Sequence, residues 1–278
     1  MQKILVPTDF SGNALKAVAY AAGIAKKANA TIHLLHVIEP SLNMANMKTD
    51  SSNKKVVKER SDELILSLKS VAAAYPDVNV IPYLAGGEII PAILEYAENE
   101  NVDLIVMGTK GATGLKQFFI GSVTAGAISK TKIPVLTVPV SYEIEEPDII
   151  LFATNQFEKN LSLLNKMIAI PALFSAAVHV VVFKDIDGDE NAHLIYNDEQ
   201  VNDYIQFLKE TFPDVKFTGA LLEGKDFEFT IDRYNDKNEG DMIMMITYPK
   251  SSFEKLFQKS VTKKMAFHST LPILAIPA

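Results

Sequence analysis

The feature that most limits how this chain can fold is an alternation of short apolar runs with longer amphipathic segments, which starts again near residue 148. In the first half, five runs have the length and apolar character of buried strands: residues 3–7, 31–38, 78–84, 104–107 and 135–140. The segments between them predict helices over residues 11–28, 54–75, 91–100 and 123–130. In the first of these helices, residues at helical spacing predict a buried stripe: Leu15, Val18, Ala22 and Ala25. Strands that alternate with helices form doubly wound parallel sheets with right-handed connections, so we expect an α/β domain of the Rossmann-like class.

The second half repeats this order. Apolar runs predict strands over residues 148–153, 176–183, 241–246 and 273–277, with a helix over residues 158–170. Residues 30–34 (ATIHL) align with residues 176–180 (AAVHV) at an offset of 146, whereas Ser122-Val123-Thr124 aligns with Ser260-Val261-Thr262 at an offset of 138. The change of offset makes the second copy eight residues shorter in its middle. We therefore expect a tandem duplication, with two five-stranded domains at residues 1–140 and 148–278 and a linker at residues 141–147.

The amino-acid composition excludes several classes of function. The 278 residues include no cysteine, which excludes disulfides, thiolate catalysis and cysteine-based zinc sites. The net charge is −7, from 27 Lys and Arg against 34 Asp and Glu, and an acidic chain without a basic block is a poor nucleic-acid binder. The sequence shows neither a run of 18 apolar residues nor the apolar core of a signal peptide. We expect a cytoplasmic protein with no membrane or nucleic-acid partner.

The most informative motif is a glycine-rich segment between a predicted strand and a predicted helix. Gly108 directly follows the strand predicted at residues 104–107, Gly111 comes three residues later, and Gly121-Ser122 directly precedes the helix predicted from residue 123. Ligands bind at the carboxyl ends of the strands in open parallel sheets, and helix N-termini attract anions. The hydroxyls of Ser122 and Thr124 could add hydrogen-bond donors. The pattern predicts a phosphate site, to which Lys110 or Lys116 in the same loop could contribute.

Two other strands end beside this predicted site. Asp9 follows the first strand and could meet a ribose hydroxyl, an adenine edge or a metal ion, and Val37 ends the second strand and could line a base pocket. The chain contains no G-x4-G-K-[ST] and no G-x-G-x-x-G, which argues against a P-loop NTPase and a dinucleotide-binding fold. His33 and His179 occupy equivalent places inside predicted strands, so we interpret them as sheet histidines rather than metal ligands. His36 lies beside Val37, and packing is its favoured role.

These residues resemble the universal stress protein family, specifically its ATP-binding branch. The family signature G-x2-G-x9-G-[ST] is matched without a gap by Gly108, Gly111, Gly121 and Ser122. The resemblance implies a domain related to the adenine nucleotide alpha hydrolases, with ATP between the ends of the first and fourth strands and Mg²⁺ or Mn²⁺ bridging its phosphates. The nucleotide-binding positions that it implies are Pro7, Thr8, Asp9, Val37, Met107, Gly108, Gly111, Gly121, Ser122, Val123 and Thr124.

The second half departs from that signature. At the positions equivalent to the three glycines stand Ile246, Pro249 and Lys259, and Asn155 and Phe183 replace Asp9 and Val37. Proline also removes a backbone N–H donor. Lys250 and Lys259 could still attract an anion. We expect a degenerate half with a structural role and no tight ATP site.

The resulting expectation is a tandem universal stress protein that acts as a nucleotide-dependent regulator or switch in a stress response, with an unidentified protein partner. No general base is evident beside the phosphates, which argues against fast turnover. The alternatives are a slow ATP hydrolase, a self-phosphorylating enzyme and a nucleotide-free interaction scaffold. Both halves end in an apolar strand, Pro134–Pro139 and Pro272–Pro277, and exposed apolar edge strands need cover. We expect the two halves to form an intrachain pseudo-dimer; the sequence leaves open a homodimer of whole chains.

Overall fold

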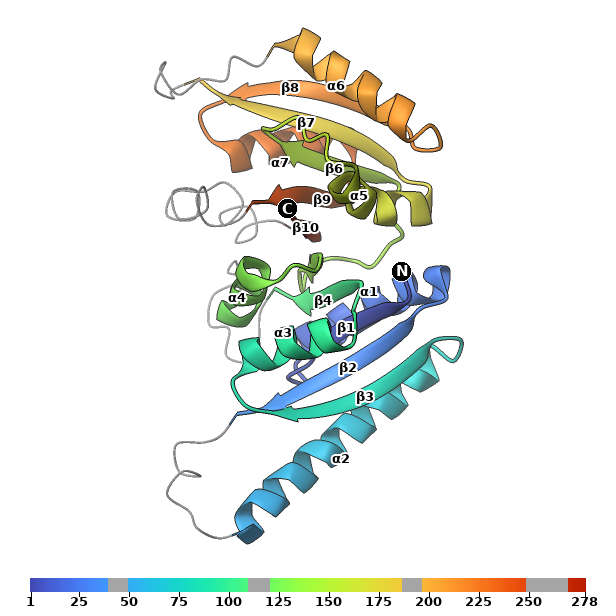
Figure 1. Ribbon diagram of the computed structural model, residues 1–278, viewed down its shortest axis with the longest axis vertical. Helices are drawn as coiled ribbons and strands as arrows, with labels where there is room; N and C mark the ends of the chain where they lie inside the picture. Colours follow the sequence, from blue (N-terminus) through green and yellow to red (C-terminus); the bar gives the residue numbers. More distant parts are fainter. Residues whose placement is uncertain (40–49, 110–120, 187–196, 249–269) are drawn as a thin grey trace. The chain divides into compact units, whose positions relative to one another are not determined.

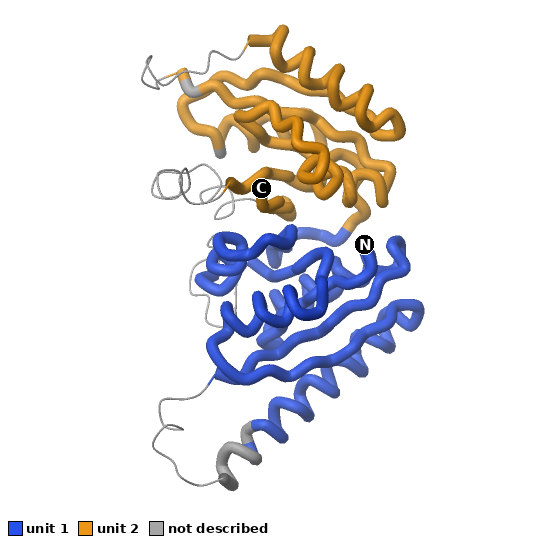
Figure 2. Tube along the Cα trace, viewed as in Figure 1, with its two compact units in different colours: residues 1–144 blue, residues 145–278 orange. Residues whose placement is uncertain are grey.

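The computed structural model describes residues 1–39, 50–109, 121–186, 197–248 and 270–278. The chain separates into two compact units, Met1–Ile144 and Glu145–Ala278, called the first and second unit below (Figure 2). No helix within the described residues is long and apolar enough to cross a membrane.

The first unit is an α/β domain with one parallel sheet (Figure 1). Its elements are β1 (Lys3–Pro7), α1 (Gly12–Ala28), β2 (Thr31–Ile38), α2 (Asp50–Ala74), β3 (Asn79–Gly86), α3 (Ile89–Asn99), β4 (Leu104–Gly108), α4 (Ser122–Lys130) and β5 (Val135–Val138). The strands pair in the order β3-β2-β1-β4-β5, and every pairing is parallel. This confirms the predicted doubly wound sheet.

The second unit repeats the architecture. Its elements are β6 (Ile149–Thr154), α5 (Leu161–Phe174), β7 (Ala177–Asp185), α6 (Asp198–Thr211), β8 (Phe217–Gly224), α7 (Phe227–Asn238), β9 (Met242–Thr247) and β10 (Ile273–Pro277). Their parallel order, β8-β7-β6-β9-β10, matches that of the first unit strand for strand. The sequence pattern assigned no boundaries to α6, β8 and α7, which complete the repeat.

The two offsets read from the sequence are borne out by the elements. Strands β1 and β2 correspond to β6 and β7 at the larger offset, and β3, β4 and β5 correspond to β8, β9 and β10 at the smaller one. The shortening lies between β7 and β8, where α6 has 14 residues and its counterpart α2 has 25. Helix α2 begins at Asp50, four residues before the predicted start.

Both units share a clamp at the amino ends of their central strands. In the first unit, one carboxylate oxygen of Asp103, just before β4, accepts hydrogen bonds from the backbone amides of Gln2 (2.6 Å) and Lys3 (3.0 Å). In the second, Asp241 accepts from Asp148 (2.8 Å) and Ile149 (2.9 Å). The recurrence at equivalent positions shows that this contact belongs to the fold, where it fixes the first strand of each unit against the fourth.

Helix α1 shows where the predicted stripe was wrong. Val18, Ala22 and Ala25 are buried as predicted, but Leu15 is 45% exposed. The buried face is centred on small residues and runs through Ala14, Ala17, Val18, Ala21 and Ala25. Leu15 lies about 100° around the helix from Ala14, at the margin of this face. A helix faced with alanine can approach the sheet closely.

Candidate functional site

The described site positions lie together where adjacent strands of the first unit end. β1 pairs with β2 on one side and with β4 on the other, so their carboxyl ends share one edge of the sheet. That edge carries Pro7, Thr8, Asp9, Val37, Met107 and Gly108, and α4 brings Gly121, Ser122, Val123 and Thr124 to it. Gly111, Lys110 and Lys116 lie outside the described residues.

The turn after β1 presents Asp9 in a fixed backbone conformation. The amide of Thr8 donates to the Leu35 carbonyl (2.8 Å), and the Thr8 hydroxyl oxygen accepts from the Phe10 amide (3.1 Å). The exposed Asp9 carboxylate accepts from the amide of Ser11 (3.0 Å). Phe10 has a φ of +64°, in the left-handed region that residues other than glycine rarely adopt.

Gly108 allows α1 to approach the end of β4. A Cβ atom at Gly108 would lie 2.8 Å from the Asn13 carbonyl oxygen, closer than a side chain tolerates. The absence of a side chain therefore brings the first turn of α1 against the end of β4. The crevice outside the carboxyl ends of β1 and β4 lies where the strand order reverses, which is the place where open parallel sheets bind ligands.

Helix α4 presents an uncapped N-terminus to this edge. Its N-cap is Gly121, and no side chain among the described residues hydrogen-bonds its first turn. Helix α3 also has no side-chain cap, whereas α1, α5, α6 and α7 are capped by Ser11, Asn160, Asn197 and Asp226. The Gly121 amide donates to the Thr109 carbonyl (2.6 Å), so the two ends of the loop that joins β4 to α4 are held together. The amides of Ser122, Val123 and Thr124 begin the helix without intrahelical partners, and with the helix dipole they suit an anion.

The hydroxyl of Thr124 forms a hydrogen bond within the protein. Thr124 is buried, and its Oγ1 donates to the Gly108 carbonyl oxygen (2.9 Å). This bond ties α4 to the end of β4 and aims the helix N-terminus at the crevice. A contact from Thr124 to a ligand therefore falls to its backbone amide, while the exposed Ser122 hydroxyl stays available as a donor.

The side of the edge nearest β2 is aromatic and apolar. Val37 is half-buried, and the neighbouring His36 ring packs on Phe10, with the two centroids 4.4 Å apart. The Nδ1 atom of His36 lies 2.8 Å from the Thr8 carbonyl oxygen. A carbonyl oxygen only accepts, so Nδ1 carries the proton and donates. The packing role predicted for His36 is present, with a hydrogen bond in addition.

The equivalent edge of the second unit is built differently. Ile246 stands where the first unit has Gly108, and α5 begins at Leu161, three residues later than the start of α1 would place it. The later start agrees with the larger side chain, because a Cβ at the position of Gly108 would collide with a helix turn as close as that of α1. Phe183, in place of Val37, packs edge-on against Phe227 of α7, with ring centroids 5.3 Å apart.

A tyrosine joins the ends of β6 and β9. The hydroxyl of Tyr248, which follows β9, donates to a carboxylate oxygen of Glu158 (3.1 Å) in the segment after β6. The other carboxylate oxygen of Glu158 accepts from the amides of Lys159 (2.8 Å) and Asn160 (2.7 Å). Burial and the Glu158 carboxylate raise the pKa of Tyr248, so it stays protonated and keeps donating. In the first unit these two strand ends flank the crevice. The positions Pro249, Lys250, Lys259, Ser260, Val261 and Thr262 lie outside the described residues.

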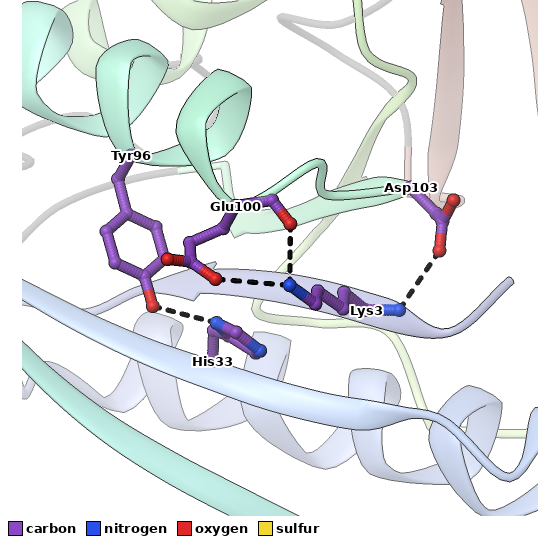
Figure 3. A network of polar contacts seen from close by, with 5 residues as sticks. All are labelled: Lys3, His33, Tyr96, Glu100 and Asp103. Carbon is purple, nitrogen blue, oxygen red and sulfur yellow. Dashed lines mark hydrogen bonds and ion pairs between the residues drawn. The ribbon is translucent and has the colours of Figure 1, made fainter.

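A second polar cluster of the first unit lies at the amino ends of the strands (Figure 3). Lys3 Nζ donates to the carbonyl (2.7 Å) and the carboxylate (3.1 Å) of Glu100, and His33 Nδ1 is 2.7 Å from the Tyr96 hydroxyl. Burial, with Glu100 and Tyr83 nearby, raises the pKa of Tyr96 to about 12, and burial and Lys3 lower the pKa of His33. A neutral imidazole paired with a neutral phenol is a packing arrangement. No group of three or more metal-ligating side chains occurs within the described part of the chain.

Two residues of the candidate site were missed as site residues by sequence reasoning: Phe10 and Asn13. The residue type gives no reason to expect a positive φ at a phenylalanine. The close approach of Asn13 depends on the absence of a Cβ atom at Gly108. Comparison of the two halves offered one signal: Phe10 and His36 are both replaced in the second unit, by Gln156 and Val182, as the glycines of the signature are.

Comparison with known proteins agrees with the fold and with the family that the sequence resembles. A model of the universal stress protein family matches residues 1–139. Universal stress protein MJ0531 of Methanocaldococcus jannaschii is 32% identical over 139 residues, which are 49% of this chain and 81% of that one. Universal stress protein YxiE of Bacillus subtilis is 32% identical over 146 residues, covering 49% and 97%. A crystal structure of a universal stress protein from Archaeoglobus fulgidus shares the fold of both units, with a TM-score of 0.76 at 19% identity over 99% of this chain and 98% of that one. The chain belongs to the universal stress protein family.

Proposed function

We propose that the first unit binds one adenine nucleotide, ATP, and that the chain acts as a nucleotide-dependent regulator of a stress response. The observation that carries this proposal is the uncapped N-terminus of α4, which Thr124 ties to the end of β4 where the strand order reverses. The first amides of this helix are donors at a place where a polyphosphate needs them. The glycine pattern and the family membership point to the same ligand.

The residues divide by the part of the nucleotide that they would meet. Gly121, Ser122, Val123 and Thr124 would hold the phosphates. Met107, Gly108 and Gly111 would lie along ribose and phosphate. Pro7, Thr8, Asp9 and Val37 would lie along ribose and adenine, with the Asp9 carboxylate as an acceptor for hydroxyl or amino groups.

The proposal includes Mg²⁺ or Mn²⁺ between the phosphates. Hard divalent cations of this kind are commonly held by one or two carboxylates together with substrate phosphates. Asp9 is the acidic side chain at the described edge of the crevice, and the described residues hold no cluster that would bind such an ion without the nucleotide. The ion would therefore arrive with ATP.

The second unit is proposed to be structural. Its edge lacks the close approach that Gly108 permits, and the carboxylate of Glu158 would repel a phosphate between β6 and β9. We infer that it has no high-affinity ATP site and that it supports the first unit structurally. A cytoplasmic location and an unidentified protein partner remain part of the same proposal.

Analysis of nucleotide released from the purified, denatured protein tests the function directly. The regulator proposal predicts ATP in an amount comparable with the protein. ADP or AMP in its place would favour the alternative of a slow hydrolase or self-phosphorylating enzyme. Protein that is empty and fails to take up added ATP would favour the nucleotide-free scaffold and contradict the proposal.

A further inference from the structure

The turn that carries Asp9 has an unusual backbone, because Phe10 has a positive φ. Thr8 accepts a hydrogen bond from the Phe10 amide, and Asp9 accepts one from the Ser11 amide. These bonds lie within the turn. They leave unexplained how Phe10 keeps a φ of +64°, a conformation that costs free energy for a residue with a Cβ atom.

One side chain from β2 contacts the turn on both sides of Asp9. His36 is 9% exposed, and its Nδ1–H donates to the carbonyl of Thr8, the residue before Asp9. Its ring packs on that of Phe10, the residue after Asp9, at 4.4 Å and an interplanar angle of 35°. The imidazole therefore fixes both neighbours of Asp9.

We propose that His36 is a positioning residue of the nucleotide site: through Thr8 and Phe10 it holds the turn so that Asp9 meets the bound nucleotide. The inference rests on the proposed function. It assigns His36 no contact with the ligand. Without the imidazole, Phe10 would relax from the left-handed region and Asp9 would lose its fixed direction.

The second unit provides an internal comparison. It retains the turn, because the Thr154 hydroxyl oxygen accepts from the Gln156 amide (3.1 Å) as Thr8 does from Phe10. It lacks the device, since Val182 stands at the position of His36 and no positive φ occurs among the described residues of that turn. Asn155 stands at the position of Asp9. The histidine, the aromatic ring and the left-handed backbone are thus absent together from the unit whose glycines are replaced.

Two substitutions in the full chain separate positioning from packing. In His36→Asn the amide nitrogen lies close to the place of Nδ1 and can still donate to Thr8, whereas in His36→Gln the amide lies beyond it. We expect ATP affinity, measured calorimetrically with Mg²⁺, to fall by about tenfold in His36→Gln and by about threefold or less in His36→Asn. The matched controls are His33→Gln and His33→Asn on the same strand, because His33 is as deeply buried but bonds to Tyr96 at the other end of the sheet. They should lower the unfolding midpoint and leave affinity unchanged.

Phe10→Gly keeps the test decisive if His36→Gln fails to fold. Glycine accepts a positive φ without strain, so this chain should fold while it lacks the ring on which His36 packs. Its ATP affinity should fall by several-fold at an unchanged unfolding midpoint. Wild-type affinity in folded His36→Gln or in Phe10→Gly would overturn the inference and leave the proposed function intact. Failure of the wild-type chain to bind ATP would overturn the proposed function, and this inference with it.

Discussion

A Gly121→Val chain should fold as the wild type does and lose ATP affinity by about 100-fold, corresponding to about 3 kcal/mol for two hydrogen bonds to a charged phosphate. Gly121 has a φ of −63° and a ψ of 153°, which valine adopts without strain. The added branched side chain would stand before the amides of Ser122 and Val123, where a phosphate is proposed. Calorimetric titration with ATP and Mg²⁺ measures the loss, and the urea unfolding midpoint measures the fold.

The same substitution in α1 provides the control. A Cβ atom at Gly23 would meet nothing within 4 Å, so Gly23→Val should leave both affinity and the unfolding midpoint near those of the wild type. A folded Gly121→Val chain that binds ATP as tightly as Gly23→Val would place the phosphates away from α4.

A fragment of residues 1–144 should self-associate. The first unit includes Tyr142, which belongs to the predicted linker and lies near Tyr20 of α1 with ring centroids 6.0 Å apart, so the fragment keeps this residue. The short apolar strand β5 is last in the strand order of this unit, and such an edge attracts a partner strand. We propose that in the full chain β10 of the second unit serves as that partner, at the high effective concentration set by the linker.

Sedimentation velocity at tens of micromolar distinguishes the outcomes. The account expects a dimer of the fragment, with ATP still bound. The full chain, whose edges would be satisfied internally, is the control. A fragment that is a folded, ATP-binding monomer would contradict the intrachain pseudo-dimer.

Much of the fold followed from the sequence because both periodicity and repetition were visible. The apolar runs at residues 3–7 and 31–38 coincide with β1 and β2, and the two offsets predicted which elements correspond. Prediction failed where the sequence pattern was ambiguous. The start of α2 at Asp50 is polar, so no apolar stripe marks it as helical. Leu15 was predicted to be buried because the residues at helical spacing from it are buried.

The candidate site was likewise predictable in part. Its glycines and Asp9 could be found because their spacing and place after strands are properties of the chain. The contacts that shape it could not. That α1 would approach Gly108 closely, that His36 would bond to Thr8, and that Tyr248 would reach Glu158 each depend on packing between segments far apart in the sequence.

The central claim is that one unit of this tandem protein binds the nucleotide and the other does not. The most direct measurement is the calorimetric stoichiometry of the full-length chain titrated with ATP and Mg²⁺. The account predicts one ATP per chain, with the signal lost in Gly121→Val. Two equivalent sites per chain, or one site that survives in Gly121→Val, would contradict it.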